Sequence, residues 1–135
     1  PAYATLTDAL DALDGSPRGI HYVAGEANER TATYAELRGR SLGLLHHLQE
    51  AGARPGSHTI ILVDGRAPFV DTFWACVLGR VVAVPLAPGN ADEHKAKFFR
   101  VLARLPAPTL ATERKVFDRL RGSPGDAPQP RFEER

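Results

Sequence analysis

Two short runs of strand-forming residues, separated by one helical segment, constrain the fold of this chain most. The runs are TIILV at 59–63 and VVAVP at 81–85, and both are continuous and rich in β-branched residues. Such runs are typical of strands that are covered on both faces. Between them, apolar residues recur at the spacing of a wide helical face: Phe69, Val70, Phe73, Trp74, Val77 and Leu78. The sequence therefore predicts a βαβ unit with parallel strands and a right-handed crossover.

Helical and extended patterns continue on both sides of this unit. We expect helices over 5–14, 34–51, 92–105 and 113–121, a hairpin of 20–25 with 31–34, and a strand at 109–112. The chain is thus predicted to be an α/β, Rossmann- or flavodoxin-like layered subdomain. It should have a mostly parallel sheet, helices on both faces and a short N-terminal hairpin.

Cap residues mark the expected helix ends. Thr33 and Glu36 have the spacing of a capping box, which predicts a helix start at Tyr34. Gly52 is expected to end that helix in the left-handed conformation. Gly79 is expected to end the next helix in the same way, and positive φ angles are also expected at Gly15 and Gly56.

The globular part is expected to span residues 1–122. Residues 123–135 are rich in Pro and Gly, so they are interpreted as a linker or exposed tail. The chain starts at Pro1 and contains no methionine, from which we expect it to be a piece of a longer protein.

Composition excludes several classes of protein. The 135 residues are 43% hydrophobic and 24% charged, which are ordinary values for a globular domain. No apolar run is long enough to span a membrane, and no signal peptide is recognisable, so a cytoplasmic location is expected. The 17 basic and 16 acidic residues are scattered through the chain, and neither nucleic acid nor membrane is an expected partner.

No catalytic, cofactor-binding or metal-binding residue is assigned from the sequence. Neither phosphate-binding glycine motif is present, and no serine lies in a G-x-S-x-G turn. The histidines lack the spacing of metal ligands, and His46 is interpreted as a solvated helical pair with Glu50. The single cysteine, Cys76, lies in an apolar helical segment and is interpreted as a buried structural residue.

Asp64 allows two interpretations. It directly follows the strand 59–63, and ligands of open parallel sheets bind beyond the carboxyl ends of strands, so Asp64 could make a polar contact in such a crevice. It could equally cap the next helix or stabilise the turn at Gly65. The spacing alone does not choose between them.

Two segments carry a resemblance to a known family. The TYAEL segment at 33–37 resembles the first core motif of adenylate-forming enzymes, and LGRVVAVPLAP at 78–88 resembles their second. In that superfamily, which includes acyl-CoA synthetases and adenylation domains, the chain resembles the N-terminal subdomain over roughly 5–120. The amino-acid sequences of 73–89 and 94–105 are most similar to those of fatty acyl-AMP ligases of polyketide and nonribosomal peptide synthetases.

The resemblance implies a parent enzyme of the acid-thiol ligase or acyl-AMP ligase class. Such enzymes use ATP and Mg to form an acyl adenylate, and they then transfer the acyl group to the thiol of an acyl carrier protein. Their phosphate loop, nucleotide-binding motifs and catalytic lysine all follow the second core motif, so none lies in this chain. The isolated chain is therefore expected to be structural and without activity, with the remaining subdomains as its partners.

An alternative is a truncated, non-catalytic interaction module within a megasynthase. A subdomain separated from its neighbours should leave apolar surface uncovered. We expect such a patch on 69–78, around Phe73 and Trp74, and self-association of the isolated chain through it.

Overall fold

The computed structural model of the chain describes residues 2–23, 29–89 and 92–122. The sequence predicts the type and order of its elements correctly. In chain order they are α1 (Leu6–Ala12), β1 (Gly19–Val23), β2 (Glu29–Thr33), α2 (Tyr34–Glu50), β3 (His58–Leu62), α3 (Arg66–Leu78), β4 (Val82–Pro85), α4 (Asp92–Arg104), β5 (Thr109–Thr112) and α5 (Arg114–Arg121). The proposed tail, 123–135, lies outside the described residues.

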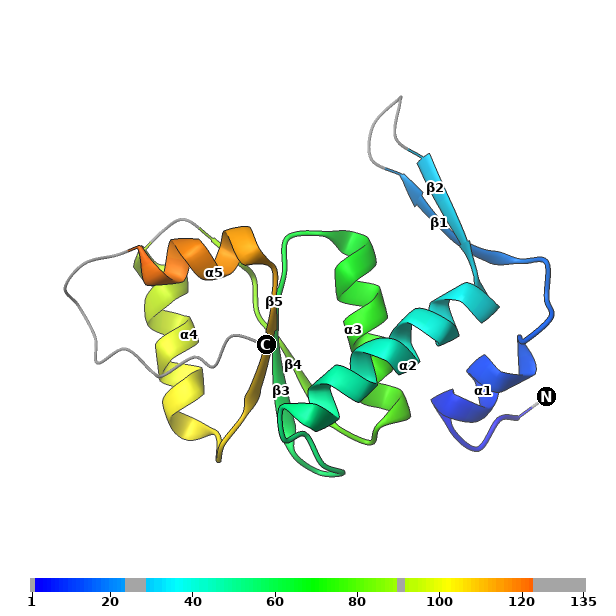
Figure 1. The fold of residues 1–135 in the computed structure, drawn as a ribbon, viewed down its shortest axis with the longest axis horizontal. Helices are drawn as coiled ribbons and strands as arrows, with labels where there is room; N and C mark the ends of the chain where they lie inside the picture. Colours follow the sequence, from blue (N-terminus) through cyan, green and yellow to red (C-terminus); the bar gives the residue numbers. More distant parts are fainter. Residues whose placement is uncertain (1, 24–28, 90–91, 123–135) are drawn as a thin grey trace.

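Strands β3, β4 and β5 form a parallel sheet in the order β4-β3-β5 (Figure 1). The chain first passes from the central strand to one edge through α3, and then returns across the sheet through α4 to the other edge. This is the winding of the first three strands of a flavodoxin-like sheet. The two connections run in opposite directions, so the topological switch point lies between β3 and β5.

Each face of the sheet carries its own helical layer, as the sequence predicts. On one face, Ile61 and Val63 pack against α2 and α3. On the other face, Ile60 and Leu62 pack against Phe98 of α4 and Val116 of α5. Alternate residues of β3 point to opposite faces, so the continuous TIILV run supplies both cores. Figure 1 shows the two helical pairs on opposite sides of the sheet.

The hairpin of β1 and β2 is antiparallel and separate from the parallel sheet. It is tied to α3 because Arg66 donates from Nη1 to the carbonyl oxygen of Val23 at 2.9 Å. Helix α1 is tied to α2 by the ion pair of Asp11 with Arg38, also at 2.9 Å. The N-terminal elements therefore attach to the α2–α3 side of the molecule.

The capping box at the start of α2 is confirmed. The Glu36 amide donates to Thr33 Oγ1 at 3.1 Å, and the Thr33 amide donates to Glu36 Oε2 at 3.3 Å. The left-handed glycine after α2 is confirmed as well, because Gly52 has a φ of 107°. These local signals fix both ends of the longest helix.

The expectation for Gly79 is wrong. Gly79 has a φ of −90°, and the left-handed residue at the end of α3 is Arg80, with a φ of 56°. A Cβ at position 79 would overlap Leu45 Cδ1 of α2, so a side chain there requires the buried Leu45 side chain to shift. The close approach of α2 to α3 therefore favours glycine at position 79.

The apolar surface expected around Phe73 and Trp74 is only partly exposed. Phe73 and Trp74 are half-buried, and α3 is covered by the sheet on one side and by α2 and part of α1 on the other. In the described part of the chain, the large apolar side chains that are exposed lie outside α3: Tyr3, Leu6, Val23, Leu42 and Val82. Whether the chain self-associates stays a prediction. Within the described residues, no helix is both long and apolar enough to cross a bilayer.

Candidate functional site

The carboxyl ends of β3 and β5 meet at the switch point, where open α/β sheets bind ligands. Asp64 follows β3 and Glu113 follows β5, so two carboxylates lie at this edge. The two strands are held together here because Thr112 Oγ1 donates to the carbonyl oxygen of Leu62 at 2.7 Å. This edge is the candidate functional site.

Asp64 is engaged by its own chain. Its Oδ2 accepts a hydrogen bond from Arg119 of α5 at 2.8 Å, and Lys115 Nζ lies 3.5 Å from the same oxygen. The Asp64 amide donates to Glu113 Oε2 at 3.0 Å. Asp64 therefore makes polar contacts within its own chain, and the ligand contact considered from the sequence stays a prediction.

Asp64 does not cap α3. The N-cap of that helix is Gly65, which makes no side-chain cap hydrogen bond. A Cβ on Gly65 would come within 3.0 Å of Glu113 Oε1 and of the Pro68 ring. Glycine thus lets the turn after β3 approach the residue that follows β5.

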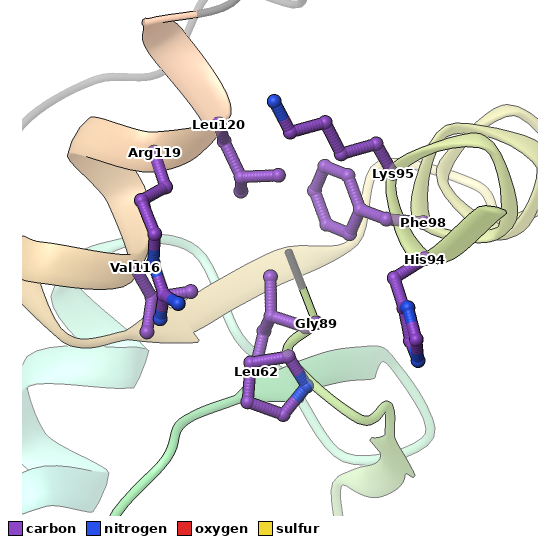
Figure 2. Close-up of a pocket in the computed structure, with 9 residues that line it drawn as sticks. Leu62, Gly89, His94, Lys95, Phe98, Val116, Arg119 and Leu120 are labelled. Atoms are coloured by element: carbon purple, nitrogen blue, oxygen red, sulfur yellow. The ribbon is translucent and has the colours of Figure 1, made fainter. Parts of the chain in front are cut away.

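A shallow pocket lies beside this network, between α4 and α5 (Figure 2). Phe98 of α4 and Leu120 of α5 face one another across it, with Leu62 of β3 below. Its lining is largely apolar and includes three side chains that carry or can carry positive charge: His94, Lys95 and Arg119. A ligand here would have to be small and apolar, with any negative charge at its rim.

The two carboxylates of this edge are engaged by the chain, because both already accept hydrogen bonds from it. Among the described residues, the lining of the pocket includes no Ser, Thr, Cys or Tyr that could serve as a nucleophile. The contacts observed here hold the sheet edge together and present basic side chains beside the pocket.

Cys76 is buried, as predicted, with none of its surface exposed. Burial raises the pKa of its thiol above the ordinary value of 9.0, and the hydrogen bond with Thr59 offsets this only in part. A thiol that stays protonated is a poor nucleophile and a poor metal ligand. Cys76 is a core residue.

A second polar cluster lies between the hairpin and the helices. Arg40 Nε of α2 donates to Asp71 Oδ2 of α3 at 3.0 Å, and the Asp71 side chain is only 11% exposed. Burial and the nearby charge of Asp71 raise the pKa of the Tyr22 hydroxyl. Sequence reasoning missed this cluster, because its members come from three separate elements and no local spacing links them.

The histidines make protein contacts of an ordinary kind. His46 and His47 both lie near Glu50, at 3.4 and 3.5 Å, which confirms the helical pair predicted for His46. His21 bonds across the hairpin to Thr31 and Glu29. Among the described residues, no group of three or more His, Cys, Asp or Glu side chains is arranged to hold a metal ion.

Glu113, Lys115 and Arg119 were also missed, although part of the signal was present. Glu113 follows the strand TLAT just as Asp64 follows TIILV, so the same rule about strand ends identifies it. Arg119 could not be found in this way. Its contact with Asp64 depends on how α5 turns back over the sheet edge.

Comparison with known proteins supports the superfamily suggested by the two motifs. The chain superposes on the solved adenylation domain of a keto acid-selecting NRPS module bound to keto acyl adenylate, with a TM-score of 0.80 and 27% identity over 90% of its length. It superposes on a fatty acid AMP ligase from Legionella pneumophila with a TM-score of 0.74 and 23% identity over 82% of its length. The described chain therefore has the fold of an N-terminal portion of an adenylate-forming enzyme.

The matched proteins are much longer than this chain. It spans 24% of the NRPS adenylation structure and 20% of the Legionella ligase. A stretch of 67 residues, half of the chain, is 36% identical to malpinin synthetase from Mortierella alpina, of which it covers 1%. No family model matches the sequence.

Proposed function

We propose that this chain is the N-terminal subdomain of an ATP-dependent ligase that adenylates a carboxylic acid and passes the acyl group to the thiol of an acyl carrier protein. The observation that carries the proposal is the similarity to an NRPS adenylation domain over 90% of the chain. The chain supplies one parallel sheet with its two helical layers, and the acyl-transfer chemistry belongs to other parts of the enzyme.

The residues present do not fit ATP or Mg²⁺. Magnesium in nucleotide sites is held by carboxylates together with substrate phosphates. At the carboxyl edge of the sheet, Asp64 is neutralised by Arg119 and Lys115. The sequence also lacks a glycine-rich phosphate loop. We therefore derive no step of nucleotide chemistry from this chain.

A fatty acid is the first candidate substrate. The sequences of segments 73–89 and 94–105 most resemble those of fatty acyl-AMP ligases, and the solved Legionella ligase shares the fold. A keto or amino acid is the second candidate, favoured by the higher identity to the keto acid-selecting module, 27% against 23%. No acid-binding residue is assigned in this chain, so activity measurements on the parent protein decide between the two.

The test is ATP–pyrophosphate exchange, measured on the gene product that contains this chain and on the isolated 135 residues. The gene product is expected to catalyse exchange with one acid of a panel of long-chain fatty acids, α-keto acids and amino acids. The isolated chain is expected to show none with any of them. Exchange by the isolated chain would contradict the structural role. A gene product without activity on any acid would support the non-catalytic interaction module instead.

A further inference from the structure

Nearly half of the basic residues lie on two helices of one layer. Helices α4 and α5 together carry eight of the 17 Lys and Arg residues and three of the acidic residues: Lys95, Lys97, Arg100, Arg104, Arg114, Lys115, Arg119 and Arg121, with Asp92, Glu93 and Asp118. Both helices cover the same face of the sheet. This layer is therefore strongly positive although the net charge of the whole chain is +1.

Three of these cations form one row along α4. Lys97, Arg100 and Arg104 are separated by three and four residues, so they lie on one face of the helix over about 10 Å. All three are exposed, whereas Phe98 of the same helix is buried against the sheet. The row therefore lies on the solvent side of the helix. We call Lys97, Arg100 and Arg104 the α4 basic row.

The α4 basic row lacks the carboxylate partners that three other arginines of the fold have. Arg38, Arg40 and Arg119 each form an ion pair at 3.0 Å or less. Within the described part of the chain, no ion pair joins the α4 basic row to a carboxylate. Like charges three or four residues apart destabilise a helix by about 0.2–0.5 kcal/mol per pair. The helix dipole favours Arg104 in the last turn but does not account for Lys97 in the middle.

An acidic residue limits what can bind along the row. Glu93 is exposed and lies four residues before Lys97, on the same face of the helix. Along this face, one negative charge is therefore followed by three positive charges. A continuous polyanion such as a nucleic acid would place a phosphate against Glu93. A helix with three carboxylates at matching spacing would meet the three cations and end before it.

We propose that the α4 basic row is a docking surface for an acidic helix of a partner protein or neighbouring domain. The partner presents carboxylates at i, i+3 and i+7, and its charge complementarity with Lys97, Arg100 and Arg104 sets its register along α4. The proposal does not depend on the enzymatic function proposed above.

The test maps binding by NMR on the isotope-labelled 135-residue chain at about 50 mM salt, where exposed charges are weakly screened. The probe is an alanine-based helical peptide with three glutamates at i, i+3 and i+7. The control probe has the same composition with its glutamates on three different faces. Saturable shifts of α4 amides are expected with the first peptide and markedly weaker ones with the second.

Two matched variants test the residues. The triple variant Lys97→Gln/Arg100→Gln/Arg104→Gln is expected to weaken binding about fivefold or more, because it removes three exposed ion pairs that each contribute modestly to binding. Arg18→Gln/Arg30→Gln/Arg80→Gln removes the same charge from exposed positions elsewhere and is expected to leave binding within about twofold. Thermal melts confirm that both variants fold.

Three results would overturn the proposal. Equal losses in the two variants would reduce the effect to net charge. Equal binding of the two peptides would remove the requirement for spacing. Tighter binding of a DNA duplex or of anionic phospholipid vesicles to α4 would identify the row as a polyanion or membrane surface.

Discussion

Gly79 illustrates how one residue type can be required for a reason other than backbone conformation. Its φ of −90° is accessible to any residue, and the strained left-handed position falls on Arg80. What excludes a side chain at 79 is the Leu45 methyl group of α2, which occupies the space that a Cβ would fill. The requirement therefore belongs to the packing of α2 on α3.

This difference can be measured. Gly79→Val should lower the free energy of unfolding by about 1–3 kcal/mol, as expected for overpacking in a tight core, and the smaller change Gly79→Ala should also be destabilising. Combining Gly79→Ala with Leu45→Ala should cost less than the sum of the two single changes, because the second change removes the overlap. Urea denaturation of the four proteins gives the coupling energy. Strict additivity would mean that Leu45 is not what opposes a side chain at 79.

Arg40 and Asp71 form the most buried ion pair of the described residues, and removing one partner should be costly. Arg40→Leu leaves the Asp71 carboxylate buried without its cation, and we expect a loss of about 2–4 kcal/mol, since breaking buried pairs typically costs 3–5 kcal/mol and Arg40 is one-third exposed. The double change Arg40→Leu/Asp71→Leu should recover much of this loss. Chemical denaturation would contradict the prediction if the double variant were less stable than Arg40→Leu.

At the scale of single elements, the start of α2 rests on the reciprocal hydrogen bonds of Thr33 and Glu36. Thr33→Ala leaves the Glu36 amide without its acceptor and should cost about 0.5–2 kcal/mol. Glu36→Gln should cost little, because glutamine also fits the third position of a capping box. Thermal unfolding followed by circular dichroism compares the two. A loss in Glu36→Gln as large as that in Thr33→Ala would contradict this and show that the negative charge of Glu36 also stabilises the helix N-terminus.

The elements could be predicted from sequence because their signals are local. The run TIILV, the capping box at Thr33 and the left-handed Gly52 each depend on a few neighbouring residues, and each was found in the structure. The candidate site could be predicted only in part. Asp64 follows a strand and was identified, whereas Arg119 lies 55 residues further on, and no spacing rule links the two.

Pro85 is the last residue of β4, and it is paired in register with Ile61 of β3. The amide of Val82 donates to the carbonyl oxygen of Ser57, just before β3, and the amide of Leu86 donates to that of Ile61 in β3. Alternate amides of a strand face opposite sides, so the nitrogen of Pro85 faces the outer edge of the sheet. Proline on an edge strand removes a donor that another chain could use. The residue thus limits pairing on one side of the strand only.

At the scale of the whole molecule, the three-stranded sheet ends on β4, which has one strand neighbour among the described residues. Val82 at its start is 46% exposed. Pro85 removes one hydrogen-bond donor from the outer edge of β4. The amide and carbonyl groups of Ala83 face the same outer side and stay available for pairing. Exposed edges with apolar side chains promote pairing between chains. The β4 edge therefore gives the expected self-association a second physical basis, besides the partly exposed α3 surface.

We expect the isolated chain to self-associate as its concentration rises, and sedimentation velocity across a concentration series measures this directly. Val82→Lys places a charge at the edge and should shift the equilibrium toward monomer, because charged side chains protect edge strands from pairing. Leu42→Lys is the matched control, since Leu42 is similarly exposed, at 41%, but lies on α2. A chain that sediments as a monomer at every concentration would contradict the prediction. An equal shift in both variants would assign the association to general surface hydrophobicity and leave the β4 edge without a role.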